Sequence, residues 1–248
     1  MGNRLQTENK LKELYFKYSW CILKIIVEDK FGDIHVGTGF HIGKGLVATA
    51  RHILDNKKIK SIGSEASVDP VVVNQIHLSA NAQIDVAVLE TSFSLEKSMD
   101  RVFYHIGKKN IPARECRASY LPLQETYDDW IGSELILSRC LIIGYPQIPT
   151  MYQTTLFAVA ADVNAVTGSY AREHAHYIVS NIPRGGFSGA PVISEYDFVL
   201  GIVTTSFTKR NGVTELGFCG AVSVEPLFVV LSENNLRPEG ISDEFWEA

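Results

Sequence analysis

The 248-residue sequence lacks any apolar run long enough to cross a bilayer, which takes about 18 or more residues. Its first residues, Met-Gly-Asn-Arg-Leu-Gln, are polar, and they carry no apolar segment of the kind found in a signal peptide. Basic residues are not in excess either, since 23 Lys and Arg stand against 28 Asp and Glu, for a formal net charge of −5. We therefore expect a cytoplasmic protein with neither a membrane nor nucleic acid as a partner.

Cysteine is scarce and scattered. The four cysteines, Cys21, Cys116, Cys140 and Cys219, form no C-x-x-C pair, and no histidines cluster near them. This spacing predicts no zinc site, and nothing else in the chain indicates a metal or a cofactor. In a chain without an export signal we expect reduced thiols, although spacing alone leaves a disulfide pair open.

Short strand-like segments dominate what is present. Apolar or alternating runs separated by turn residues recur from Trp20 onward, with no fixed repeat. Many short strands with few helices predict an all-β fold, either a sandwich or a pair of barrels. The expected strands are 21–28, 34–42, 46–50, 71–78 and 86–90 in a first set, and 102–106, 135–144, 155–165, 177–181, 190–194, 199–205 and 215–222 in a second set.

The remaining segments are expected to flank these strands. Residues 7–17 have apolar side chains at helical spacing, which predicts a short amphipathic helix packed on the body as a lid or brace. Residues 225–234 predict a closing helix, and residues 238–248 a frayed acidic tail. The acidic, aromatic stretch 120–133 is either a substrate-facing loop or, as we prefer, a solvated insertion.

Ser188 is the first candidate for chemistry. It lies in Gly185-Gly-Phe-Ser-Gly189, directly before an apolar run. Glycines on both sides permit turns that expose a hydroxyl and let backbone N–H groups converge. An acyl-transfer nucleophile and its oxyanion hole need this arrangement. Taken alone, an ordinary tight turn between strands is the commoner explanation of such a motif.

Two further residues strengthen that prediction. His52 follows a predicted strand that ends in small residues, which leave room around an imidazole, although a structural histidine is the alternative. Asp85 lies at the mouth of an apolar strand, where a carboxylate needs a partner unless it merely caps the strand. The order His52, Asp85, Ser188 is that of the chymotrypsin-type catalytic triad, so the three signals support one another.

Several stretches carry a family resemblance. Through these stretches the sequence resembles the trypsin-like serine peptidases of the chymotrypsin clan. Within that clan it is closest in style to Deg/HtrA-type catalytic domains without a PDZ domain. The resemblance covers about residues 20–231. The matching stretches are Gly-Thr-Gly-Phe-His-Ile at 37–42, Leu-Val-Ala-Thr-Ala-Arg-His at 46–52, Ile-Asp-Val-Ala-Val at 84–88, Leu-Ile-Ile-Gly-Tyr-Pro at 141–146, Gly-Gly-Phe-Ser-Gly-Ala-Pro-Val at 185–192 and Leu-Gly-Ile-Val-Thr-Thr at 200–205.

The resemblance implies a definite organisation. We expect two orthogonal, antiparallel, six-stranded β-barrels with short N-terminal and C-terminal helices. Residues 20–100 would form the first barrel and residues 101–224 the second. Residues 1–19 would be a helical extension and residues 225–248 a helix and tail, all within one catalytic unit.

The same resemblance implies a serine endopeptidase acting on a protein or peptide substrate without a cofactor. His52, Asp85 and Ser188 would form the triad, and the backbone N–H groups of Gly186 and Ser188 the oxyanion hole. The remaining implied site residues are Thr204, Thr205 and Ser206, which would pair with the substrate backbone, and Ile182 at the base of the primary specificity pocket.

One departure from the family concerns Phe187. Digestive relatives have an aspartate at this position, and it receives the new N-terminal ammonium after zymogen cleavage. Phe187 cannot form that ion pair, so the oxyanion loop must be shaped in another way. An activating protein partner is one candidate. The alternative to a peptidase is a catalytically silent or partner-gated peptide-binding protein on a protease-like fold.

Overall fold

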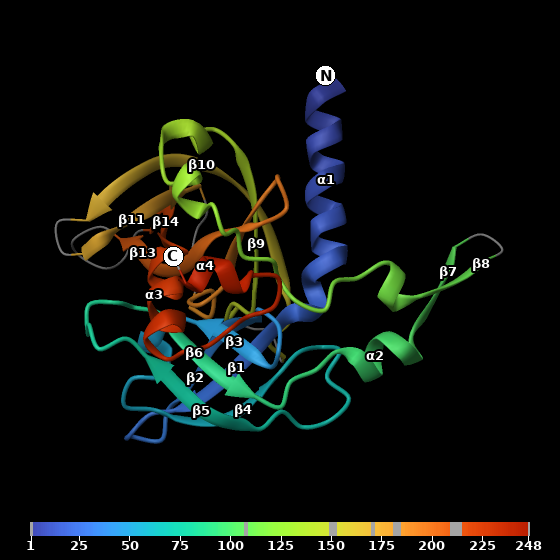
Figure 1. The fold of residues 1–248 in the computed structure, drawn as a ribbon, viewed down its shortest axis with the longest axis horizontal. Helices are drawn as coiled ribbons and strands as arrows, with labels where there is room; N and C mark the ends of the chain where they lie inside the picture. Colours follow the sequence, from blue (N-terminus) through green and yellow to red (C-terminus); the bar gives the residue numbers. More distant parts are fainter. Residues whose placement is uncertain are drawn as a thin grey trace.

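The computed structural model describes residues 2–106, 109–148, 153–169, 172–180, 185–208 and 215–247. Two antiparallel β-sheets make up most of the molecule, and a few helices lie around them (Figure 1). The predicted all-β architecture with two barrel-like halves is confirmed. Of the helices within those ranges, none has the length and apolar character that a bilayer crossing requires.

The first sheet has six strands in the order β4-β1-β2-β3-β6-β5. Its edge strands β4 and β5 are not hydrogen-bonded to each other, so the sheet curls without closing. The sequence analysis missed β4 because this edge strand is mostly polar and exposed, and therefore lacks an apolar pattern. The strands are β1 (Ile22–Glu28), β2 (Ile34–His41), β3 (Leu46–Thr49), β4 (Lys58–Gly63), β5 (Val73–Leu78) and β6 (Ala87–Thr91).

The second sheet is a closed barrel in the order β10-β11-β14-β13-β12-β9. Its strands are β9 (Arg139–Gly144), β10 (Phe157–Ser169), β11 (Arg172–Val179), β12 (Pro191–Ser194), β13 (Val199–Thr208) and β14 (Glu215–Ser223). All the strand pairs in both sheets are antiparallel.

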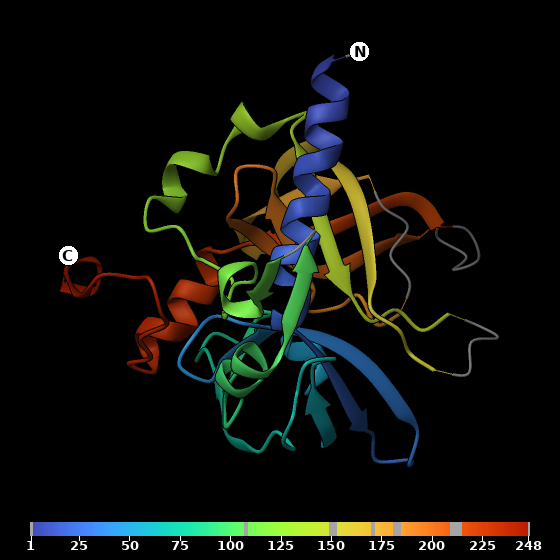
Figure 2. The ribbon, with the colours of Figure 1, turned by 90° about the vertical axis from the view of Figure 1, so that its right-hand side faces the viewer.

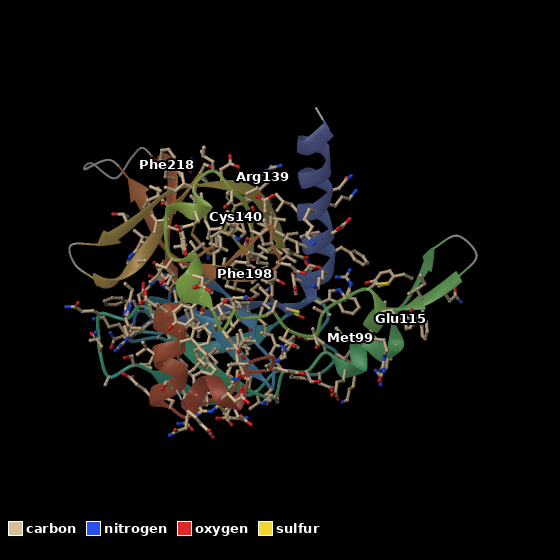
Figure 3. The ribbon with its side chains drawn as sticks, turned by 45° about the horizontal axis from the view of Figure 1, so that its top comes forward. Met99, Glu115, Arg139, Cys140, Phe198 and Phe218 are labelled. Atoms are coloured by element: carbon tan, nitrogen blue, oxygen red, sulfur yellow. The ribbon has the colours of Figure 1, made fainter. Side chains whose placement is uncertain are left out.

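Strand β9 explains how two cores fit against each other. Successive side chains of a strand point to opposite faces. Accordingly, Cys140 and Ile142 join the core inside the closed barrel, whereas Leu141 and Ile143 join the larger core that continues into the first sheet. Figure 3 shows Cys140 within this barrel. The uninterrupted apolar run of β9 is therefore required by burial on both faces.

An arm leaves the body between the two sheets. It consists of α2 (Glu96–Arg101) and a hairpin of β7 (Phe103–Ile106) and β8 (Lys109–Pro112). The prediction that residues 102–106 belong to the second set of strands is wrong, because β7 pairs only with β8 within the described chain. The arm projects away from both sheets in Figure 1, and Met99 and Glu115 mark it in Figure 3.

The N-terminal helix α1 (Gly2–Tyr18) is longer than predicted and runs alongside the second barrel (Figures 1 and 2). Leu11, Leu14 and Tyr18 are buried against the body. The Tyr18 hydroxyl donates a hydrogen bond to Asp197 at 2.7 Å, and Lys17 Nζ lies 2.6 Å from the same carboxylate. Asp197 is in the turn between β12 and β13, so the end of α1 is attached to the closed barrel.

Two expectations of solvated segments are wrong. Tyr127, in the stretch predicted as a solvated insertion, stacks on Phe228 of α3 (Glu225–Glu233) with ring centroids 4.7 Å apart. In the predicted frayed tail, Phe245 and Trp246 of α4 (Asp243–Glu247) pack on the same Phe228 at 5.1 and 5.9 Å. Burial of these aromatic rings outweighs the acidic character of both segments.

Five short 3-10 helices complete the described part of the chain. They are η1 (Ser19–Cys21), η2 (Arg51–Ile53), η3 (Ala113–Glu115), η4 (Tyr127–Trp130) and η5 (Ser133–Leu135).

All four cysteines are described and free. Burial raises the pKa of the Cys219 thiol to about 12 and raises those of Cys21 and Cys140 even further. These three thiols are therefore protonated and unreactive at neutral pH.

Candidate active site

His52 and Asp85 are in direct contact. His52 lies in η2, which follows β3 after Ala50, and Asp85 lies two residues before β6, which is hydrogen-bonded to β3. His52 Nδ1 lies 2.9 Å from Asp85 Oδ2 and 3.1 Å from Oδ1, and the backbone N–H of His52 donates to Oδ1 at 2.9 Å. The Asp85 side chain is 12% exposed and the His52 side chain 42%. This carboxylate favours a proton on Nδ1 and leaves Nε2 available to accept one.

The Ser188 turn requires its glycines. Gly186 and Gly189 have φ values of +103° and +82°, in the region that side chains rarely adopt. A Cβ atom on Gly186 would lie 2.2 Å from the Tyr145 carbonyl oxygen, and one on Gly189 would lie 2.1 Å from the Thr38 carbonyl oxygen. Both clashes are with backbone atoms, which cannot easily move. The glycine pattern seen in the sequence is therefore a requirement of close backbone approach.

Thr38, which the sequence analysis did not single out, holds the Ser188 turn. This residue of β2 is fully buried. Its N–H donates to the Ser188 carbonyl at 2.9 Å, and its Oγ1 donates to the Gly186 carbonyl at 2.6 Å and accepts from the Tyr145 N–H at 2.9 Å. The Thr49 hydroxyl in turn donates to the Thr38 carbonyl at 2.7 Å. A polar side chain in the apolar stretch 37–42 was the only sequence signal for this role.

These contacts bring the Ser188 turn to the strand that precedes His52. The Cβ position of Gly189 lies 2.4 Å from Thr49 Oγ1 and 2.9 Å from the N atom of Ala50, and Ala50 leads into η2. Ser188 is half-buried. Among the described residues, no hydrogen bond joins the Ser188 hydroxyl to the His52 ring.

Two backbone N–H groups around Ser188 have no acceptor among the described residues. Gly189 donates to the Val203 carbonyl at 2.8 Å and Ala190 to the Phe187 carbonyl at 2.9 Å. Within the described part of the chain, the N–H groups of Gly186 and Ser188 have no acceptor. A turn with two uncommitted N–H groups next to a serine can bind an oxyanion.

Phe187 anchors the turn by burial. Its side chain is 4% exposed and belongs to the core of the closed barrel. A Cβ atom on Gly144 would lie 2.9 Å from the Phe187 ring, so glycine at that position makes room for it. Burying a phenylalanine is worth about 1.5–3 kcal/mol. The buried Phe187 ring thus stands at the position where digestive relatives have an aspartate that forms an ion pair.

The predicted substrate-binding residues lie at one edge of β13. Thr204 is 8% exposed and lies at a bulge, Thr205 is half-buried, and the backbone of Ser206 pairs with Cys219 of β14. On the opposite edge of β13, the pairing with β12 ends at Ile202 and Val203 still bonds to Gly189 and Ala190, so within the described ranges that edge has no partner beyond Val203. Another predicted site residue, Ile182, is outside the described residues.

A buried histidine near the site has a structural role. Burial lowers the pKa of His41 to about 4, so its ring is neutral at pH 7. Its Nδ1 donates to the Ser119 carbonyl at 2.7 Å, and its Nε2 accepts the N–H of Gly45 at 3.1 Å. Both ring nitrogens are thus occupied, and His41 holds β2 to its neighbours.

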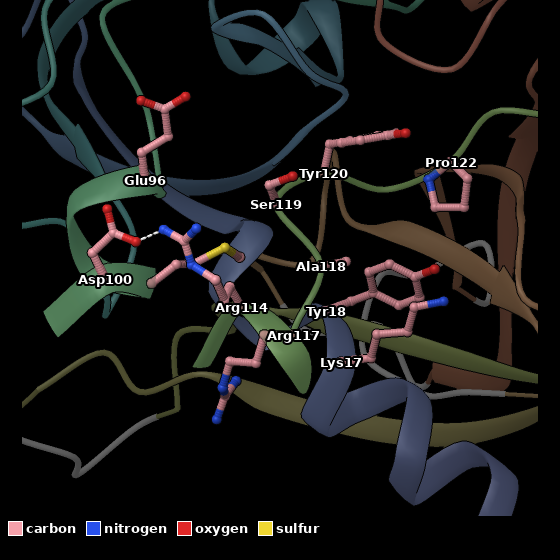
Figure 4. Close-up of a pocket in the computed structure, with 11 residues that line it drawn as sticks. Lys17, Tyr18, Glu96, Asp100, Arg114, Arg117, Ala118, Ser119, Tyr120 and Pro122 are labelled. Atoms are coloured by element: carbon pink, nitrogen blue, oxygen red, sulfur yellow. Dashed lines mark ion pairs between the residues drawn. The ribbon is translucent and has the colours of Figure 1, made fainter. Parts of the chain in front are cut away.

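A separate cavity of about 580 Å³ lies where the end of α1, helix α2 and residues 114–122 meet (Figure 4). Of the site residues predicted from the sequence, none that the structure describes lines this cavity. Arg114 pairs with Asp100 in its wall, and Lys17 pairs with Asp197. These cations are already neutralised within the chain. Elsewhere too, no group of three or more His, Cys, Asp or Glu side chains among the described residues could hold a metal ion.

Comparison with known proteins places the chain in a family. Residues 37–202, more than half of the sequence, match the trypsin-like peptidase domain family. No curated protein sequence matches this chain.

Among solved structures, the HtrA-type protease AlgW with tripeptide has a TM-score of 0.63 at 16% identity, over 90% of this chain and 62% of that one. The Rv3671c protease from M. tuberculosis in its active form has a TM-score of 0.61 at 16% identity, over 95% and 88%. The serine endoprotease from Yersinia pestis has a TM-score of 0.58 at 16% identity, over 90% and 65%. The chain thus spans less than two thirds of the length of AlgW and of the Yersinia protein.

At this level of identity the solved structures show a shared fold. The matched residues begin in β2, the strand that holds the Ser188 turn, and end in β13, the strand beside that turn. The chain therefore belongs to the trypsin-like peptidase domain family.

Proposed function

We propose that this protein is a serine endopeptidase with Ser188 as nucleophile, His52 as general base and Asp85 as the residue that orients His52. The contact of Asp85 with His52 Nδ1 at 2.9 Å is the observation that carries the proposal. It leaves Nε2 unprotonated on a half-exposed ring, as a base requires. Family membership and the placement of the Ser188 turn beside Ala50 and η2 support the same assignment.

The reaction proceeds through an acyl-enzyme. Ser188 Oγ attacks the scissile carbonyl carbon while His52 Nε2 takes its proton, and the carbonyl oxygen becomes an oxyanion bound by the N–H groups of Gly186 and Ser188. His52 then gives the proton to the leaving amine as the C–N bond breaks. Water attacks the resulting ester, with His52 again as base, and releases the acid and free Ser188.

The substrate binds as an extended strand along the free edge of β13. Thr204, Thr205 and Ser206 supply the backbone groups that pair with it. The family pattern assigns Ile182, which is outside the described residues, to the primary specificity pocket, and an apolar residue there disfavours Lys or Arg at the cleavage position. These assignments follow the family pattern, and the edge of β13 beyond Val203, which has no partner within the described ranges, supports those of Thr204, Thr205 and Ser206.

The alternative is a silent or partner-gated peptide-binding protein. The absence of a hydrogen bond between the two described residues Ser188 and His52 favours it. Free enzymes often form this bond only when substrate binds, so the observation does not exclude a peptidase. A partner-gated enzyme would have the same residues in the same roles.

Labelling with a serine-reactive fluorophosphonate, located by peptide mass spectrometry, tests the proposal. We expect labelling at Ser188 that is lost in Ser188→Ala and retained in Ser94→Ala, which removes an exposed serine elsewhere. Absence of labelling in the wild-type protein, with a folded Ser188→Ala control, would contradict an activated serine and favour the peptide-binding alternative.

A further inference from the structure

The loop that leads to Asp85 is shaped by hydrogen bonds. Residues 80–83 are exposed, so hydrophobic packing does not fix them. Ser79 Oγ accepts the N–H of Asn81 at 3.1 Å, Asn81 Oδ1 accepts the N–H of Gln83 at 3.0 Å, and the Asn81 carbonyl accepts the N–H of Ile84 at 3.1 Å. Ile84 is buried and directly precedes Asp85. A continuous chain of bonds therefore runs from Ser79 to the residue before Asp85.

The C-terminal end of α3 anchors this chain of bonds. The Glu233 carboxylate accepts the Ser79 hydroxyl at 3.2 Å and the Ala80 N–H at 3.0 Å. The next residue, Asn234, donates from Nδ2 to the Leu78 carbonyl at 3.2 Å. One carboxylate thus holds both residues at the start of the loop, which are 154 and 153 positions away in sequence.

Helix α3, which carries Glu233, packs firmly against the core. Leu227, Val230 and Leu231 on its inner side are fully buried, and Phe228 is stacked under Tyr127. A residue at the end of such a helix has a fixed position. Functional side chains are held most accurately when their supporting residues belong to packed elements of this kind.

We propose that Glu233 is a positioning residue for catalysis, and that it fixes the Asp85 loop through Ser79 and Asn81. This inference rests on the proposed peptidase function. Asp85 must stay within hydrogen-bonding distance of His52 Nδ1, and small displacements of supporting residues reduce catalytic rates. The Glu233 carboxylate hydrogen-bonds to the loop. Replacing Glu233 therefore changes the orientation of His52 and leaves substrate binding intact.

Steady-state kinetics of Glu233→Ala with a fluorogenic peptide tests this role. We expect kcat to fall about three- to tenfold, or about 0.6–1.4 kcal/mol, with KM unchanged, because the lost hydrogen bonds are partly exposed. Ser79→Ala should have a similar effect, and the double variant should lose no more than either single one. Glu225→Gln is the matched control, because Glu225 lies at the other end of α3 and bonds to Ser223.

A second measurement is independent of turnover. The low-field ¹H NMR resonance of the proton between His52 Nδ1 and Asp85, assigned by its loss in Asp85→Asn, should shift or broaden in Glu233→Ala and stay unchanged in Glu225→Gln. A role confined to stability would lower the melting temperature and leave both kcat and this resonance unchanged, which would overturn the proposal. Failure of Ser188 to react with fluorophosphonate would contradict the peptidase assignment only, because the resonance reports the His52–Asp85 contact directly.

Discussion

The turn that carries Ser188 and the loop that carries Asp85 are both anchored from outside their own sheet, but in contrasting surroundings. The Ser188 turn belongs to the closed barrel and is bonded to Thr38 of the first sheet, which is fully buried. The Asp85 loop belongs to the first sheet and is bonded to Glu233, an exposed residue that follows the closed barrel in sequence.

The contrast shows where an error in geometry is costly. A buried carbonyl or N–H that loses its partner cannot turn to water, whereas an exposed one can. The serine turn therefore tolerates little change at Thr38, at its glycines or at Phe187. The aspartate loop has water as a substitute partner, so Glu233 adjusts the site more than it creates it. The predicted effects below run from the largest to the smallest.

The largest effect should come from Asp85 itself. We expect Asp85→Asn to lower kcat by about 10,000-fold, because an asparagine amide in contact with Nδ1 favours the wrong tautomer of His52. The backbone N–H of His52 retains an oxygen acceptor, so the fold should persist. Stopped-assay kinetics together with thermal unfolding checks both statements. Near-native turnover in a folded variant would show that Asp85 does not orient His52.

Phe187→Ala separates packing from chemistry in the serine turn. Truncating this buried ring should lower the free energy of unfolding by about 3–5 kcal/mol and loosen the turn that provides the oxyanion donors. Urea unfolding measures the first effect, and fluorophosphonate labelling of Ser188 the second. Phe187→Leu, which keeps most of the volume, is the control. Unchanged stability in Phe187→Ala would contradict the anchoring role of the ring.

The strand that carries Thr38 should also weaken in acid. The pKa of His41 is lowered to about 4 in the folded protein, below its usual value of 6.5, so the unfolded chain takes up its proton first as the pH falls. Above pH 6.5 the neutral His41 ring makes its full contribution to the free energy of unfolding. As the pH falls from 6.5 to 4, that free energy decreases by about 3 kcal/mol.

Urea unfolding at several pH values measures this loss. His41→Gln should be less stable than the wild type at pH 7 but should show a shallower pH dependence between pH 6.5 and pH 4. Equal slopes in the wild type and in His41→Gln would assign the acid sensitivity to other groups.

Thr38→Val tests the buried anchor directly. The substitution keeps the shape of the side chain but leaves the Gly186 carbonyl and the Tyr145 N–H without their hydroxyl partner. We expect kcat to fall about 10- to 100-fold, for a cost of roughly 1–3 kcal/mol. Thr38→Ser keeps the hydroxyl and should remain close to wild type. A smaller effect in Thr38→Val than in Glu233→Ala would reverse the comparison between the two anchors.

Much of the site could be predicted from the sequence because its chemistry requires particular residue types at short range. Ser188 needs glycines beside it, and His52 and Asp85 each border an apolar strand. Strands buried on both faces, such as β9, are recognisable from their apolar runs alone. The edge strand β4 has no such run, and the hairpin of β7 and β8 cannot be told from a barrel strand by local pattern.

The sequence by itself therefore determined the family, the all-β class and the candidate residues His52, Asp85 and Ser188, since these depend on local residue types and their order. Only the tertiary structure decided that Thr38 holds the serine turn, that Phe187 is a core residue and that Glu233 reaches the Asp85 loop. The physical reason is that hydrogen bonds between residues more than 100 positions apart leave no local periodicity. Their partners are chosen when the two sheets and α3 pack together.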